Sequence, residues 1–175
     1  MQPPPIAPDY VRLLASYGEW MNGSLYAAAA TLDDEERRRD RGAFFKSIHA
    51  TLSHLLWADM NWLNRLAATG EPPATSIRGS LEWEPDFERL RARREVFDRV
   101  LTGWAERCTA ADLTGSLTYA AVSVNREITG PRWLFVVHLF NHGTHHRGQV
   151  HAMLTAAGAK PGDTDLPLTP GALAI

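Results

Sequence analysis

Apolar residues recur at three- and four-residue spacing along four long stretches of the chain. This spacing is the period of an amphipathic α-helix, whose apolar stripe has to be buried against other elements. The predicted helices cover Tyr10–Ala30, Ala43–Ala68, Pro85–Cys108 and Pro131–Ala157. Four helices of this length, in a chain without visible internal repeats, indicate an all-α protein built as a four-helix bundle.

The stripes also predict which side chains of each helix face the core. Phe44 belongs to the stripe of the second helix, and Val96 and Val100 belong to the stripe of the third. The charged run RARRE, at residues 91–95, is predicted to face solvent.

Residues that start and stop helices set the expected helix ends. Asp9 offers a cap for the first helix, and Pro131 suits the first turn of the last helix. Gly70 and the two prolines that follow it are expected to end the second helix. Gly158 is expected to end the fourth.

The segments between the helices have a different texture. Residues 31–40, TLDDEERRRD, place acids before arginines as a helix dipole prefers, and they predict a short polar helix or turn. Ala74–Trp83 shows no periodicity and is expected to be a loop. Thr, Val, Tyr and Ile are frequent before the last helix, which favours a short β-hairpin with strands at Ser116–Val122 and Asn125–Thr129.

Composition indicates one domain over residues 1–175, with proline-interrupted, extended tails at 1–8 and 159–175. The net charge is −2 and the arginine runs are interleaved with acids, so nucleic-acid binding is not expected. No uncharged apolar run reaches 18 residues, so no membrane span is expected. Cys108 is the only cysteine, which excludes an intramolecular disulfide, and a cytoplasmic protein is expected.

Histidines are concentrated in the last helix. Five of the seven lie in the stretch LFVVHLFNHGTHHRGQVHAML. His142 and His146 are one helical turn apart, so both imidazoles can point the same way and chelate a divalent metal. Helical spacing also allows His138 with His142, or His142 with His145, and it leaves these alternatives open.

A metal site with an open position needs a third ligand from another helix, and His54 is the best candidate. It lies between Leu52 and Leu55 in a helix that otherwise faces the core, and His49 is the fallback. Taken singly, His49 and His151 are more often hydrogen-bonded core residues than ligands. The sequence therefore predicts a three-histidine site, whose ligands suit zinc, nickel or iron.

Three other polar residues are weak candidates for catalytic roles. Gln149 lies near the face of the histidine pair and could bond a metal-bound water, with a structural role as the alternative. Asp59 follows His54 by five residues, which favours a cap, a pairing with an arginine or an orienting contact over metal ligation. Arg147 is a candidate for holding a substrate carboxylate, with an ordinary surface ion pair as the alternative.

Most of the chain resembles the DinB family, in the wider DinB/YfiT-like group. The segments that carry the resemblance are YGEWMNGSLYAA, DEERRRDRGAFFKSIHATLSHLLWADMNWLNRL and HLFNHGTHHRGQVHAML. It implies an up-down-down-up four-helix bundle, commonly a homodimer, with a divalent metal held by one histidine of the second helix and two of the fourth. On this sequence these histidines match His54, His142 and His146. Ser53 departs from the family pattern, because an asparagine before the ligand is more typical.

The resemblance also suggests a chemistry. Members of the wider group include mycothiol-dependent maleylpyruvate isomerase and bacillithiol S-transferases, so we expect a metal-dependent transferase or isomerase that uses a low-molecular-weight thiol and an electrophile. One alternative is a metal-dependent hydrolase, which would use the same ligands to activate water. Another is a non-catalytic, metal-stabilised dimer that binds a ligand or partner in a stress response.

Overall fold

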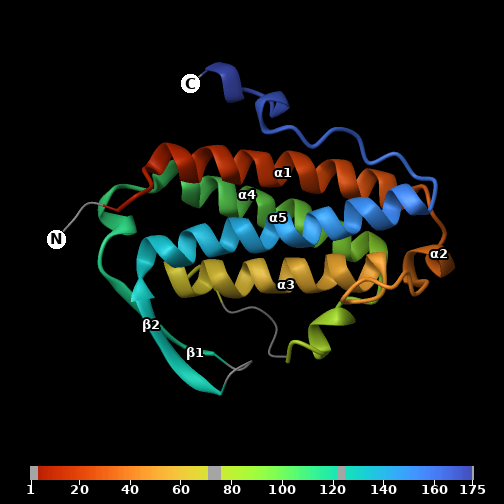
Figure 1. The fold of residues 1–175 in the computed structure, drawn as a ribbon, viewed down its shortest axis with the longest axis horizontal. Coiled ribbons are helices and arrows are strands. Elements are labelled where there is room, and N and C mark those ends of the chain that lie inside the picture. Colours follow the sequence, from red (N-terminus) through yellow and green to blue (C-terminus); the bar gives the residue numbers. More distant parts are fainter. Residues whose placement is uncertain (1–3, 71–75, 122–124, 175) are drawn as a thin grey trace.

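The computed structural model describes residues 4–70, 76–121 and 125–174, and four long helices dominate it (Figure 1). They are α1 (Pro8–Ala30), α3 (Ile48–Ala67), α4 (Phe87–Arg107) and α5 (Arg132–Ala156). α3 packs mainly on α5, and α1 lies against both α4 and α5. In Figure 1, α1 and α5 run in one direction and α3 and α4 run in the other, which confirms the predicted up-down-down-up bundle. Apolar side chains from all four helices fill its centre.

α1 begins slightly earlier than the sequence pattern predicts. Pro8 is its first residue and Ala7 is the N-cap, without a side-chain cap. Asp9 lies within the first turn and pairs with Arg12, so its predicted capping role was wrong. A proline suits the first helical position because its missing N–H would have no helical partner there.

α3 begins later than predicted because Ser47 caps it. The Ser47 hydroxyl accepts a hydrogen bond from the Ala50 N–H at 3.2 Å, and the helix starts at Ile48. Lys46, in the turn before the cap, has a left-handed φ of 68°. Phe44 therefore lies outside the helix and is 78% exposed, so its predicted core position was wrong.

The other helix ends lie close to the predicted signals. α3 ends at Ala67, where Ala68 adopts the left-handed conformation two residues before Gly70. The two prolines after Gly70 lie outside the described residues. Gly158, with a φ of 82°, follows the end of α5 as predicted. Pro131 is the N-cap of α5 and the last residue of a strand, and so it is not in the first helical turn.

α4 is rotated relative to the predicted stripe. Its buried positions are spaced by three and four residues and include Phe87, Leu90, Arg94, Phe97 and Leu101. Val96 and Val100, which were predicted to face the core, are 55% and 39% exposed and line a cleft of about 430 Å³ between α3 and α4. The predicted core positions of these two valines were wrong because Arg94, which was predicted to face solvent, lies on the buried face of the helix instead.

A buried ion cluster accounts for the position of Arg94. Its Nη1 donates to Asp59 Oδ2 at 2.8 Å, and its Nη2 donates to Asp98 Oδ1 at 2.6 Å. Asn22 Nδ2 donates to the same oxygen of Asp98 at 2.9 Å. A charge is tolerated in a protein core when opposite charges and hydrogen bonds satisfy it. The cluster therefore connects α1, α3 and α4 at the centre of the bundle.

The shorter elements also follow the sequence pattern. α2 (Asp34–Arg38) is the predicted polar helix, and Asp33 caps it by accepting from the Glu36 N–H. The antiparallel strands β1 (Ser116–Ala121) and β2 (Arg126–Pro131) form the predicted hairpin, while residue 122 lies outside the described chain. The hairpin covers one end of the bundle, where Tyr119 of β1 packs edge-on against Trp62.

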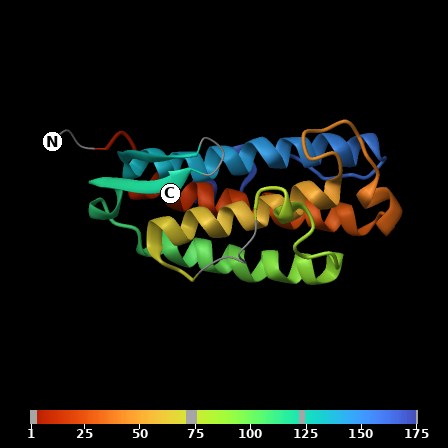
Figure 2. The same ribbon diagram turned by 90° about the horizontal axis from the view of Figure 1, so that it is seen from below.

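Short 3₁₀ turns interrupt the remaining connections. In the described chain they are η1 (Gly79–Leu81), η2 (Ala111–Leu113), η4 (Leu166–Leu168) and η5 (Ala172–Ala174). The segment predicted as a loop therefore contains η1, which packs on α3 (Figure 2), and its residues 74 and 75 lie outside the described ranges. The C-terminal tail runs back along α1 (Figure 1), where Tyr17 Oη donates to the Thr164 carbonyl oxygen at 2.9 Å. None of the helices described is both long and apolar enough to cross a membrane.

Removal of the central arginine tests the buried ion cluster. We expect Arg94→Ala to lower the free energy of unfolding by about 3–5 kcal/mol, because it leaves two carboxylates buried without their cation. Urea denaturation followed by circular dichroism measures this change. Arg91→Ala is the control, since Arg91 on the same helix makes only an exposed pair with Glu95, worth about 0.5 kcal/mol or less. Equal losses in the two variants would contradict a stabilising role for the cluster.

Candidate metal centre

Three histidines converge where α3 packs on α5. His54 comes from α3, and His142 and His146 come from successive turns of α5. One ring nitrogen of each lies within 4.8 Å of the other two, and the Nε2 atoms of His142 and His146 are 3.2 Å apart. Of the pairs that helical spacing left open, the structure brings this one together with His54.

The spacing of the cluster fits a divalent metal ion. Zinc–nitrogen bonds of about 2.0–2.1 Å in tetrahedral geometry place two ligand nitrogens about 3.3 Å apart. The 3.2 Å between the Nε2 atoms of His142 and His146 is close to that value. Two ring nitrogens at this distance repel each other unless a proton or a cation lies between them. Among the residues described, these histidines with His54 form the single group that has the donor types and proximity a metal requires.

Burial keeps the three imidazoles neutral, which is the form that binds metals. Burial lowers the pKa of His54 to about 4, and His146 adds to the effect. Burial likewise lowers the pKa of His142 to about 3, with smaller contributions from the neighbouring histidines. The pKa of His146 is also lowered by burial, although the hydrogen bond that its ring donates to Gln149 partly offsets the change. At neutral pH each ring therefore offers a lone pair.

Two hydrogen bonds orient the rings. His54 Nδ1 lies 2.8 Å from Ser80 Oγ, and His146 Nδ1 lies 2.8 Å from Gln149 Oε1. These contacts occupy Nδ1 and make Nε2 the nitrogen available to a metal. Gln149 therefore contacts a histidine, whereas the sequence left open a bond to a metal-bound water or a structural role. Ser80 was missed because it lies in a segment without periodicity, 26 residues away from His54.

Aromatic side chains surround the cluster. The Phe45 ring centroid lies 4.2 Å from that of His54 and 5.3 Å from that of His146. The Trp57 ring lies 6.0 Å from that of His54. These contacts remove water from the imidazoles and contribute to their low pKa values. Sequence reasoning missed Phe45 because it placed this residue within the second helix.

Two other histidines lie away from the cluster and are hydrogen-bonded to backbone carbonyl oxygens. His49 is fully buried, and its Nε2 lies 3.0 Å from the Glu84 carbonyl oxygen. It therefore does not act as the fallback for His54. His151 Nε2 lies 3.1 Å from the Gly162 carbonyl oxygen. Both residues are hydrogen-bonded, as is usual for single histidines on a helix.

The two remaining histidines flank the cluster on α5. His138 packs edge-on against Trp62, with ring centroids 4.6 Å apart, and its ring lies 5.6 Å from that of His142. His145 is exposed, and its ring centroid lies 4.9 Å from that of His146. Both lie outside the group of nitrogens that converge.

Asp59 and Arg147, two of the weak catalytic candidates, lie in the core. Asp59 pairs with Arg94, so of its predicted roles the pairing with an arginine is the one observed. Arg147 is 6% exposed, its Nη2 donates to Thr144 Oγ1 at 3.2 Å, and its guanidinium lies 5.7 Å from the Tyr17 ring centroid. The predicted surface ion pair of Arg147 was therefore wrong, and its burial leaves the guanidinium unsuited to holding a substrate carboxylate.

The glycine between the histidines of α5 has a packing role. A Cβ atom at Gly143 would lie 2.9 Å from Nη1 of Arg147, so the absence of a side chain makes room for the buried guanidinium. The run HGTHHR, at residues 142–147, thus combines two requirements. His142 and His146 belong to the candidate metal site, while Gly143 and Arg147 belong to the packed core.

Acid is expected to destabilise the metal-free protein through these histidines. The unfolded chain takes up protons near the ordinary histidine pKa of 6.5, whereas folded His54 and His142 stay neutral down to about 4 and about 3. The free energy of unfolding therefore falls as the pH drops from about 6.5 toward about 4. Urea denaturation in the presence of a chelator measures it. In His142→Gln, which lacks one of these two imidazoles, the free energy of unfolding should fall less steeply with decreasing pH. An unchanged pH dependence would contradict the lowered pKa of His142.

Comparisons with known proteins agree with this architecture. The model of the DinB family matches residues 8–172. Protein DinB of Bacillus subtilis (strain 168) is 24% identical over 161 residues, which cover 90% of this chain and 91% of that protein. The crystal structure of a DinB-like protein from Bacillus cereus ATCC 10987 has the same fold, with a TM-score of 0.58 and 17% identity over 82% of this chain and 90% of that one. The chain therefore belongs to the DinB family.

Proposed function

We propose that the protein is a divalent-metal-dependent enzyme that joins or rearranges an electrophilic substrate with the help of a low-molecular-weight thiol, as a transferase or isomerase. One observation carries this proposal: three neutral imidazoles converge, two of them buried and that of His142 half-buried, and no fourth protein ligand joins them among the described residues. Three protein ligands are typical of catalytic metal sites because they leave a position for substrate, whereas structural zinc sites have four.

The residues around the cluster support a reactive site. A zinc, nickel or iron ion held by His54, His142 and His146 would supply Lewis-acid chemistry that lowers the pKa of a thiol. Ser80 and Gln149 fix the directions of two of the rings. The neighbouring aromatic rings exclude water, which strengthens electrostatic interactions within the site. The thiol-dependent isomerases and S-transferases of the wider DinB/YfiT-like group support the choice of a thiol as cosubstrate.

Metal-assisted hydrolysis receives less support from the site. A hydrolase needs a general base within reach of the attacking water. In the described chain the converging group contains no carboxylate, and Asp59 is held by Arg94 in the core. Gln149, the other candidate, is engaged with His146.

Metal analysis tests the first part of the proposal. Wild-type protein purified without a histidine tag or chelator is expected to carry about one divalent ion per chain, as three-histidine sites do. Elemental analysis should find no metal in His142→Ala, which removes one of the three converging ring nitrogens. His145→Ala is the matched control, because it removes an exposed histidine from the same helix. Retention of metal by His142→Ala, or its loss from His145→Ala, would contradict the assignment.

A substrate screen tests the second part. Metal-loaded wild type is expected to convert an electrophile only when a low-molecular-weight thiol is present, with the thioether or isomer detected by mass spectrometry. His142→Ala should lose more than about 100-fold in rate, since loss of a ligand exceeds the loss of a group that merely orients one. His145→Ala should retain the rate. Turnover that does not require a thiol would support the hydrolase. Metal binding without turnover of any electrophile tested would support the non-catalytic dimer.

A further inference from the structure

The connection from α3 to α4 brings another element to the metal centre. These two helices run parallel, so the chain returns along the bundle between them, and η1 on this return packs on α3 (Figure 2). Ser80 in η1 is fully buried, with its Oγ 2.8 Å from His54 Nδ1. A residue of the connection thus lies directly behind the only α3 histidine of the cluster.

The backbone of Ser80 is hydrogen-bonded to α3. Ser53 Oγ donates to the Ser80 carbonyl oxygen at 2.7 Å, and Ser53 is fully buried as well. Trp83 Nε1 donates to the Ser53 carbonyl oxygen at 3.1 Å. These two hydrogen bonds hold the connection that contains η1 against α3 at two separate points, Ser80 and Trp83.

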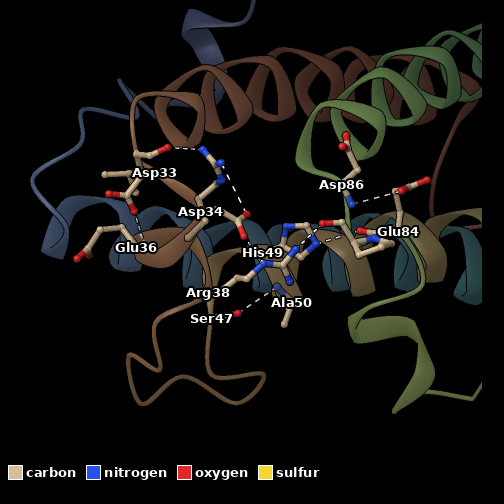
Figure 3. Close-up of polar contacts among 12 residues, drawn as sticks. Asp33, Asp34, Glu36, Arg38, Ser47, His49, Ala50, Glu84 and Asp86 are labelled. Atoms are coloured by element: carbon tan, nitrogen blue, oxygen red, sulfur yellow. Dashed lines mark hydrogen bonds and ion pairs between the residues drawn. The ribbon is translucent and has the colours of Figure 1, made fainter.

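Another hydrogen bond joins the same connection to α3 one helical turn earlier (Figure 3). His49 Nε2 lies 3.0 Å from the Glu84 carbonyl oxygen, which can only accept, so this nitrogen carries the proton. The buried Glu84 carboxylate accepts hydrogen bonds from Arg89 Nε and Arg93 Nε, each at 3.0 Å. The segment that follows η1 is therefore held to both α3 and α4.

The single proton of the Ser80 hydroxyl determines the state of His54. Ser80 Oγ lies 2.6 Å from the Ile77 carbonyl oxygen, which is an acceptor, so the hydroxyl donates its proton there. Its oxygen must then accept from His54, which donates from Nδ1–H. The reverse arrangement would take the donor away from the Ile77 carbonyl. With the proton on Nδ1, the lone pair of a neutral His54 is on Nε2.

We infer that Ser80 is a positioning residue that fixes the tautomer and ring direction of His54, so that Nε2 is presented to the cluster. This role toward the metal rests on the metal site proposed above, whereas the tautomer itself is a property of the chain alone. Ser53 has a separate part, since its hydroxyl donates to the backbone of η1, whereas the hydroxyl of Ser80 is bonded to the imidazole of His54.

Nitrogen-15 NMR of the labelled full-length protein tests the tautomer. Two-bond correlations between ring protons and nitrogens are recorded for chelator-treated and zinc-loaded protein, and His54→Gln assigns the signals. We expect His54 to carry its proton on Nδ1 in both samples, and to lose this preference in Ser80→Ala. A proton on Nε2 of His54 in wild type would overturn the inference.

Cobalt titration of two serine variants tests the positioning role. Ser80→Ala should weaken Co²⁺ binding by about 10- to 100-fold, as expected for loss of a group that orients a ligand, and should alter the visible absorption of the bound ion. Ser53→Ala is the matched control, because it also removes one fully buried hydroxyl bonded across the same contact, and it should bind Co²⁺ with much smaller change. Equal weakening in both variants would overturn the role of Ser80, since it would indicate a general loosening of η1.

The two measurements separate this inference from the proposed function. Wild type that binds no Co²⁺, yet holds His54 with its proton on Nδ1, would refute the metal site and keep the tautomer assignment. Wild type that binds Co²⁺ with His54 protonated on Nε2 before binding would keep the metal site and refute the role of Ser80. Unchanged Co²⁺ affinity in Ser80→Ala would likewise refute it.

Discussion

The packing of α3 on α5 is the constraint on which the candidate metal centre depends. Packed helices hold their axes about 8–10 Å apart, a separation at which side chains from facing turns meet. Leu52 of α3 and Leu139 of α5 belong to the common apolar core, so burial of hydrocarbon sets this separation. His54 and His142, far apart in sequence, meet at the same contact. Apolar packing therefore supplies the free energy that places polar ligands.

The same two helices carry charged side chains into the bundle. Asp59 follows His54 by five residues, and Arg147 directly follows a histidine of the cluster. Both are buried, as are Arg94 and Asp98, so two arginines and two aspartates give this part of the core a formal charge of zero. Charges that balance within a core avoid the large cost of an isolated buried ion. The burial that tightens these pairs is also what holds the histidines in their neutral form.

Local rules explain what could be predicted from the sequence. Helical periodicity and glycine signals located the long helices, and four-residue spacing identified His142 and His146 as one of several pairs. Features that depend on distant segments escaped. Arg94 reads as a surface charge until aspartates from two helices are placed around it. The start of α3 shifted because Ser47, inside an apolar stretch, forms a cap. Ser80 has no local signal, since only the path of the chain brings it to the site.

The parallel orientation of α3 and α4 has a consequence for how such a protein can diversify. In a bundle whose successive helices alternate in direction, short turns at the ends join them and no chain passes along their flanks. Here a crossover passes beside a candidate ligand while remaining outside the helical framework. Substitutions in such a segment can retune a site without repacking the helices, as loops do on other rigid scaffolds. The bundle thus separates the helices that set its architecture from a connection in which substitutions can change the surroundings of the histidine cluster.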